Sequence, residues 1–109
     1  MARVEDEWRD GVRVARLEGE IDSSNVEDVR GRLRSLVTNE SQALVVDLSA
    51  TDYLDSAGIN MLFAFGDEMR AHQLRMALVV REGAPIGRML SITGLDRAVE
   101  TFTSLEAAL

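Results

Sequence analysis

The sequence predicts a single α/β domain in which a mixed β-sheet packs against helices. The chain has 109 residues, which is a common length for one domain. After two short N-terminal strand candidates, strand-like apolar runs alternate with segments whose apolar residues recur every three or four positions, as in helices. This alternation favours parallel strand pairing. We therefore expect an N-terminal hairpin, then alternating strands and helices with about four helices, over residues 1–109.

The N-terminal hairpin is expected from two neighbouring segments. Residues 4–9 form a weak strand candidate, and Gly11 supplies a turn. The second strand, which starts near Val12, partly alternates apolar residues with arginines.

The first helix is expected to follow a cap at Ser24. Its apolar residues share one helical face. They are Val26, Val29, Leu33, Leu36 and Val37. Ser24 followed by Glu27 has the spacing of a capping box, in which both side chains bond backbone amides at the helix start.

The middle of the chain predicts two buried strands around a second helix. Residues 43–48 and 74–80 are mostly apolar without alternation, which is typical of central strands in a sheet covered on both faces. Between them we expect a loop over residues 49–53 and a helix over residues 56–72. Phe63 and Phe65 cannot both face the core from this helix, so one of them is expected at the surface.

The C-terminal third predicts one more helix, one more strand and a final helical turn. Pro85 suits the first position of a helix, and Gly94 suits its C-terminal cap. A strand is expected over residues 98–102, and a capping box starting at Thr103 precedes the last turn.

Charge and composition exclude several classes of function. With 12 basic and 19 acidic residues, the formal charge is −7, which argues against binding a nucleic-acid backbone. All the basic residues are arginine, so there is no lysine for Schiff-base or P-loop chemistry. The sequence holds no apolar stretch of the ~20 residues that cross a membrane, and its acidic start is unlike a signal peptide.

Metal and catalytic sites are not expected either. The sequence has no cysteine, and His72 is its only histidine. His72 is expected to complement the dipole at a helix C-terminus rather than to bind a metal. We expect a cytoplasmic binding protein with no cofactor and no enzymatic activity.

The strongest candidate site is the junction between a strand and a helix over residues 47–58. In open α/β sheets, function gathers where strand C-termini meet helix N-termini. Asp55 or Ser56 would cap the helix, and Gly58 allows close backbone approach. Judged from the local sequence alone, ordinary helix capping is a sufficient explanation for Asp55 and Ser56.

A phosphate at this junction would meet opposing influences. Phosphorylation of Ser56 would add about −1.5 to −2 charge at the favourable end of a helix dipole. Asp47, Asp52 and Asp55 are close in sequence and would oppose that charge. Such a switch would act chiefly by changing what a partner can dock against.

Four segments together resemble the STAS domain family, which covers sulphate transporter domains and anti-sigma factor antagonists. They are residues 17–22 (LEGEID), 45–48 (VVDL), 53–59 (YLDSAGI) and 92–95 (ITGL). The resemblance runs in order from about Val12 to Leu109, and the Asp-Ser-x-Gly box starting at Asp55 is its most specific part.

This resemblance implies a stand-alone antagonist in a partner-switching system. The unphosphorylated protein would bind an anti-sigma factor that is also a serine kinase, and so release the sigma factor. The kinase would use its own ATP to phosphorylate Ser56, and a phosphatase would restore binding. The protein would be a monomer or a weak dimer. The implied partner-binding residues are Asp22, Asp55, Ser56, Ala57, Gly58 and Asn60.

Two other branches of the family stay open. Ala57 and Asn60 stand where many antagonists carry a second hydroxyl residue and a second glycine. The alternative is a cytosolic STAS subunit that stabilises the ATPase of a bacterial phospholipid-transport ABC complex. A third reading is an unphosphorylated, stressosome-like scaffold.

Overall fold

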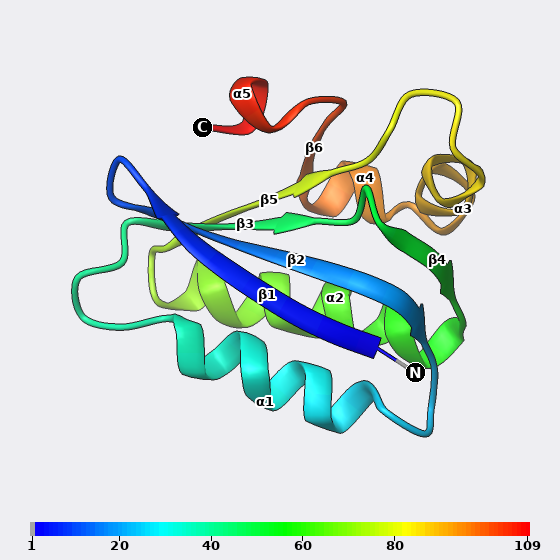
Figure 1. Ribbon diagram of the computed structural model, residues 1–109, viewed down its shortest axis with the longest axis horizontal. Helices are drawn as coiled ribbons and strands as arrows, with labels where there is room; N and C mark the ends of the chain where they lie inside the picture. The colour runs from blue at the N-terminus through cyan, green and yellow to red at the C-terminus, as the bar shows by residue number, and fades with distance from the viewer. Residues whose placement is uncertain (1) are drawn as a thin grey trace.

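The structure, a computed structural model, describes residues 2–109 as a six-stranded sheet with five helices (Figure 1). The strands are β1 (Ala2–Arg9), β2 (Val12–Ile21), β3 (Ala43–Asp47), β4 (Thr51–Leu54), β5 (Arg75–Val79) and β6 (Glu100–Phe102). The helices are α1 (Val26–Leu36), α2 (Ser56–Ala71), α3 (Pro85–Thr93), α4 (Leu95–Ala98) and α5 (Leu105–Ala108). Within residues 2–109, no helix is long and apolar enough to cross a membrane.

The sheet confirms the expected mixture of antiparallel and parallel pairing. Its order is β1-β2-β3-β5-β6, with β4 paired to the far end of β2. β1 and β2 form the predicted antiparallel hairpin. Its turn places Asp10 at φ 53° and Gly11 at φ 83°, as a tight two-residue turn of this hand requires. The remaining pairings are parallel.

Helices cover both faces of the sheet, which is why the central strands are apolar over most of their length. In Figure 1, α1 and α2 lie below the sheet and α5 lies above it. From β3, Leu44 and Val46 enter the main core with α1 and α2. Val45 joins a smaller cluster that includes Ala108 of α5. Side chains of one strand thus alternate between two apolar layers, as the unbroken apolar run predicts.

The loop prediction for residues 49–53 is wrong, because part of this segment is β4. β4 pairs in parallel with residues 19–21 of β2, with a register shift between Gly19 and Glu20. The sequence of β4, Thr-Asp-Tyr-Leu, shows no apolar run, and only its two end residues are buried. Its pairing partner lies about thirty residues earlier in the chain, so the local sequence does not predict the strand.

Two predicted helix caps are each displaced by one residue. Asn25, not Ser24, precedes α1, and its side chain makes no capping bond there. Ser24 donates its hydroxyl to Asp22 instead, so the expected capping box is absent. At α5 the cap is Ser104, whose Oγ accepts a bond from the amide of Ala107 at 3.2 Å, rather than Thr103.

The other helices agree with expectation, with one addition. α3 starts at Pro85 and ends at Thr93, and it is capped by Gly94, which adopts the left-handed conformation at φ 82°. The short helix α4 follows directly and is a fifth helix beside the expected four or so. On α2, Phe65 is buried in the core and Phe63 is half-buried against the same core, so the expectation that one of them lies at the surface is wrong.

Candidate functional site

Asp55 builds the junction between β4 and α2. Its Oδ1 accepts a hydrogen bond from the amide of Gly58 at 3.0 Å, which caps α2. Its Oδ2 accepts a bond from the amide of Ser23 at 3.1 Å, in the turn after β2. The Asp55 amide itself donates to the carbonyl of Ile21 at 3.1 Å. One residue therefore joins the first turn of α2 to the end of β2.

Gly58 lets the first turn of α2 approach β2 closely, as the sequence predicts. A Cβ at this position would lie 3.1 Å from Leu54 Cδ2 and 3.2 Å from the carbonyl oxygen of Ile21. Both distances are shorter than ordinary van der Waals contact, and one of them is to backbone. A glycine here keeps α2 seated on the end of the sheet.

Ser56 is the first residue of α2, so Asp55 rather than Ser56 is the cap. Its side chain is exposed. Asn60, which is also exposed, lies four residues further on and so shares the same side of the helix. Ala57 is half-buried and packs against the core, while Gly58 is buried. The junction thus presents one hydroxyl to the solvent at a helix N-terminus, where the dipole favours negative charge.

Asp22 lies in the turn that Asp55 holds. Its Oδ1 accepts bonds from the amide of Ser24, at 2.9 Å, and from the Ser24 hydroxyl. The hydroxyl bond is the main cause that lowers the pKa of Asp22 below its ordinary value. The Asp22 amide donates to Asn25 Oδ1 at 3.0 Å, which fixes the turn further. Through Ser23 and Asp55, the structure brings the Asp22 turn next to the start of α2.

Asp47 does not belong to this junction, contrary to the expectation that its charge would oppose a phosphate there. It continues the alternation of β3 on the face away from α2. Asp47 as a whole residue is 3% exposed. Its carboxylate accepts a bond from the Ser49 amide at 2.9 Å and lies 3.5 Å from Arg16 Nε. The third aspartate, Asp52, is exposed on β4 and remains close in sequence to Ser56.

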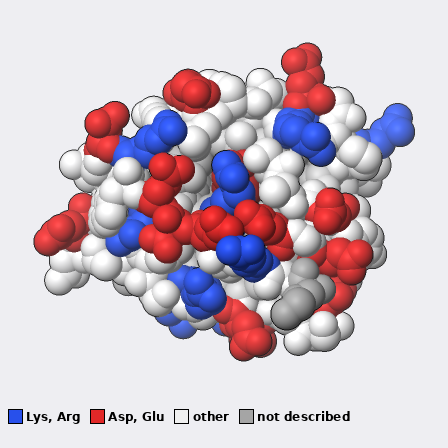
Figure 2. Space-filling view, in the orientation of Figure 1, with Lys and Arg blue, Asp and Glu red and all other residues white. Residues whose placement is uncertain are grey.

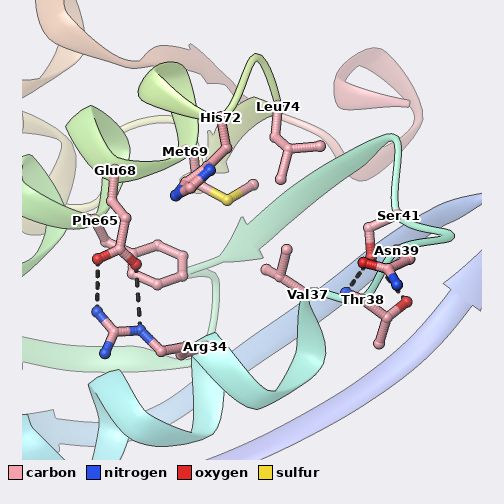
Figure 3. Close-up of a pocket in the computed structure, with 10 residues that line it drawn as sticks. All are labelled: Arg34, Val37, Thr38, Asn39, Ser41, Phe65, Glu68, Met69, His72 and Leu74. Carbon is pink, nitrogen blue, oxygen red and sulfur yellow. Dashed lines mark hydrogen bonds and ion pairs between the residues drawn. The ribbon is translucent and has the colours of Figure 1, made fainter.

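A groove of about 580 Å³ lies at the opposite end of α2 (Figure 3). Val37, Phe65 and Met69 supply apolar side chains to it, and the ion pair between Arg34 and Glu68 crosses it. His72, beside this groove, is exposed. Over residues 2–109, no three potential metal-ligating side chains come together. The groove contains none of the predicted site residues.

Surface charge gives no sign of a nucleic-acid interface on the face seen in Figure 2. Basic and acidic side chains are interspersed there, without a continuous basic patch. Ion pairs such as those of Glu68 with Arg30 and Arg34 join α1 to α2 across the surface. The net charge of −7 agrees with this mixed, acidic surface.

The geometry offers a hydroxyl that another protein can reach. The Asp55 carboxylate is engaged by two amides, and Asp22 is engaged by Ser24. Sequence reasoning missed the bond between Ser23 and Asp55, because its two residues lie 32 positions apart. No sequence signal marks a backbone amide as a long-range donor.

Comparisons with known proteins find similar sequences and similar structures. Residues 3–108 match the STAS domain. The chain is 31% identical over 99 residues to the anti-sigma-F factor antagonist RsfB of Mycobacterium tuberculosis, covering 91% of this chain and 80% of that protein. The crystal structure of an anti-sigma factor antagonist from Mycobacterium paratuberculosis superposes with a TM-score of 0.83 at 29% identity, covering 99% of this chain and 91% of that one. The Bacillus cell fate determinant SpoIIAA, in its phosphorylated form, shares the fold with a TM-score of 0.69 at 22% identity, covering 99% and 96%.

Proposed function

Because the chain belongs to the STAS domain family, we propose that it is an anti-sigma factor antagonist that works by partner switching. In its unphosphorylated form it binds an anti-sigma factor that is also a serine kinase, and the sigma factor is released. Phosphorylation of Ser56 ends this binding, and a phosphatase restores it. The protein is a regulator without catalytic activity of its own, and it acts in the cytoplasm beside the transcription machinery.

The exposed hydroxyl of Ser56 at the N-terminus of α2 is the observation that carries this proposal. Relatives at about 30% identity are named as anti-sigma factor antagonists, which supports the same role here. The Asp22 turn, held to the start of α2 by Asp55, adds a second segment to the surface that a partner would cover. The proposed partner-binding residues are those the sequence singled out: Asp22, Asp55, Ser56, Ala57, Gly58 and Asn60.

The proposed modification is a phosphoryl transfer in which this chain is the substrate. Ser56 Oγ forms a bond to the γ-phosphorus of ATP held by the kinase. The bond from that phosphorus to the bridging oxygen breaks, ADP leaves, and the hydroxyl proton goes to a base of the kinase. Hydrolysis of the phosphoserine by the phosphatase returns the hydroxyl and releases inorganic phosphate.

A phosphate on Ser56 weakens docking for an electrostatic reason. A hydroxyl can hydrogen-bond within a tight interface, but a phosphate brings about −1.5 to −2 charge into it. Asp22 and Asp55 already place carboxylates in the neighbouring turn and cap. Burying a further charge without a cationic partner costs several kcal/mol. A loss of about 3–4 kcal/mol lowers affinity by two to three decades, which suffices to exchange partners.

Incubation with purified anti-sigma factor kinases and ATP, followed by intact mass measurement, tests the proposal. We expect one phosphoryl group per chain, located at Ser56 by peptide mapping and lost in Ser56→Ala. Ser23→Ala is the matched control, because Ser23 is exposed in the adjacent turn and only its amide bonds Asp55. Ser23→Ala should be phosphorylated like the wild type.

Binding measurements complete the test. Wild-type protein and Ser56→Ala should both bind the kinase, whereas Ser56→Glu should bind at least tenfold more weakly. Equal binding by Ser56→Glu, or a phosphate that persists in Ser56→Ala, would contradict the proposed switch. Failure to bind any anti-sigma factor kinase, together with a stable complex with an ABC-transporter ATPase, would favour the transport-subunit alternative.

A further inference from the structure

The side chain of Asn25 bonds the turn between β2 and α1 at two places. Asn25 directly precedes α1 and is half-buried. Its Oδ1 accepts a hydrogen bond from the Asp22 amide at 3.0 Å, and its Nδ2 donates to the carbonyl of Glu20 at 2.9 Å. Its backbone amide also donates to the Asp22 carbonyl at 3.2 Å. One planar amide group thus bonds the chain on both sides of Ile21.

Asn25 does not do what its position before a helix favours. Asparagine is among the residues preferred there, because its side-chain oxygen can accept a bond from an amide of the first helical turn. Asn25 makes no such bond to α1. Its oxygen is bonded instead to Asp22, which precedes it in the chain. Departures from a local preference are expected at functional sites, so this asparagine calls for a role in the turn.

The turn that Asn25 bonds lies beside the start of α2. The Asp55 amide donates to the carbonyl of Ile21 at 3.1 Å, and the Ser23 amide donates to Asp55 Oδ2 at 3.1 Å. These bonds flank Asp22 and place it next to the residue that precedes Ser56. In Figure 1 the chain from β2 to α1 passes the point where β4 leads into α2. The position of Asp22 beside α2 therefore depends on the conformation of this turn.

The other bonds of the turn do not replace those of the Asn25 side chain. Ser24 donates its amide and its hydroxyl to the Asp22 carboxylate, and the Val26 amide donates to the Asp22 carbonyl at 2.9 Å. These bonds join Asp22 to residues that follow it. The Asn25 side chain also reaches back to Glu20, which is still part of β2. It therefore holds the turn against the strand as well as closing it.

We infer that Asn25 is a positioning residue for partner binding, because it holds the turn that carries Asp22 in place beside Ser56. This inference rests on the proposed function, in which Asp22 and Ser56 meet the same partner. A surface that is ordered before binding loses less conformational freedom when the partner docks, so a residue that orders it raises affinity. Asn25 acts through Asp22 and takes no part in the phosphoryl transfer.

Two substitutions separate this role from a purely structural role at the start of α1. Asn25→Ala removes both side-chain bonds of the turn and leaves no side chain that can cap the helix. Asn25→Ser also loses the paired bonds, because a single short hydroxyl cannot reach as far as the amide group of asparagine. Serine is nevertheless as favourable as asparagine directly before a helix. Asn39→Ser is the matched control, since Asn39 is exposed in the loop beyond the other end of α1.

Urea unfolding and NMR measure what each variant does to the fold. Asn25→Ser should be more stable than Asn25→Ala, because its hydroxyl can cap α1. The Cα chemical shifts of α1 should stay helical in both variants. The Asp22 amide should exchange with solvent about tenfold faster in both, since it loses its acceptor. An unchanged exchange rate of this amide would overturn the inference, because the turn would then not depend on Asn25.

Binding and phosphorylation are measured with the anti-sigma factor kinase that the wild-type protein binds. We expect both Asn25 variants to raise Kd and the KM for phosphorylation about tenfold, with kcat within twofold of wild type, because Ser56 itself is unchanged. Asn39→Ser should bind within twofold of wild type. The gain in stability of Asn25→Ser over Asn25→Ala should bring no gain in affinity, which a purely structural role would not produce.

The outcomes distinguish the inference from the proposed function. Wild-type affinity in Asn25→Ser, despite a faster exchange of the Asp22 amide, would overturn the inference and leave the proposed function standing. A kcat that falls while KM is unchanged would also overturn it, because the effect would then lie in the phosphoryl transfer. If no anti-sigma factor kinase binds or phosphorylates the wild-type protein, the proposed function fails and the inference fails with it.

Discussion

Replacing Asp55 with alanine should destabilise the protein by about 2 kcal/mol. The side chain caps α2 through Gly58 and separately holds the turn at Ser23. Loss of an N-cap costs about 1 kcal/mol. Loss of one further hydrogen bond to an exposed backbone amide costs about another 1 kcal/mol. The two bonds connect different segments, so their losses should add approximately.

The two bonds can be separated by a milder substitution. In Asp55→Asn, the side-chain oxygen can still accept from Gly58, but the amide nitrogen would face the Ser23 amide, donor against donor. This variant should therefore lose about 1 kcal/mol or slightly more. Asp52→Ala is the matched control, since Asp52 is an exposed aspartate on the neighbouring strand. It should stay within about 0.5 kcal/mol of wild type.

Urea unfolding followed by circular dichroism measures these differences, provided that the slope of the transition is unchanged. For a domain of this size, 2 kcal/mol corresponds to a drop in melting temperature of roughly 8 °C or more. Stability of Asp55→Ala within 0.5 kcal/mol of wild type would refute the claim that Asp55 joins β2 to α2. Equal losses in the alanine and asparagine variants would show that the bond to Ser23 alone matters, whereas an asparagine variant as stable as wild type would show that the cap alone matters.

Three further predictions concern the same fold. Gly58→Ala should lower the free energy of unfolding, measured with urea, by about 1 kcal/mol, because crowding against the backbone outweighs the gain in helix propensity. Gly31→Ala is the control: it has open space around it, so the substitution should be neutral or stabilising. The lowered pKa of Asp22 means that its ionised form stabilises the folded state above pH 3.8, and that this contribution is lost as the pH falls through the lower folded value. Ser24→Ala should move that pKa upward in a carbon-13 titration by NMR; an unchanged value would contradict the assigned cause. Ser104→Ala should loosen α5 by about 1 kcal/mol, seen as faster exchange of the Ala107 amide.

Local patterns in the sequence determined most of the architecture. The unbroken apolar runs of β3 and β5 predicted central strands covered on both faces, and the structure places α1 and α2 on one face and α5 on the other. Gly94 predicted the end of α3, because the residue that follows a helix often adopts the left-handed conformation, and glycine adopts it without a steric penalty. These features depend on residues within a few positions of one another, so short-range periodicity and backbone preference suffice to reveal them.

The candidate site could be located from the sequence but not assembled from it. Asp55, Ser56 and Gly58 stand together in the chain, and the close approach at Gly58 was expected. Which residue caps the helix, and which residue stays exposed, became clear only in the structure. The proposed roles of these residues as partner contacts remain predictions for the binding experiments.

Contacts between distant segments were decided by the tertiary structure alone. β4 is a strand because β2 lies beside it, since its own residues show no strand pattern. Asp47 faces away from α2 because the pleat of β3 sends it to the other layer. Ile92 reads as an ordinary apolar helix residue until the packing of α3 leaves it in the solvent. A sequence records what each residue prefers, whereas exposure and long-range hydrogen bonds depend on which segments the folded chain brings together.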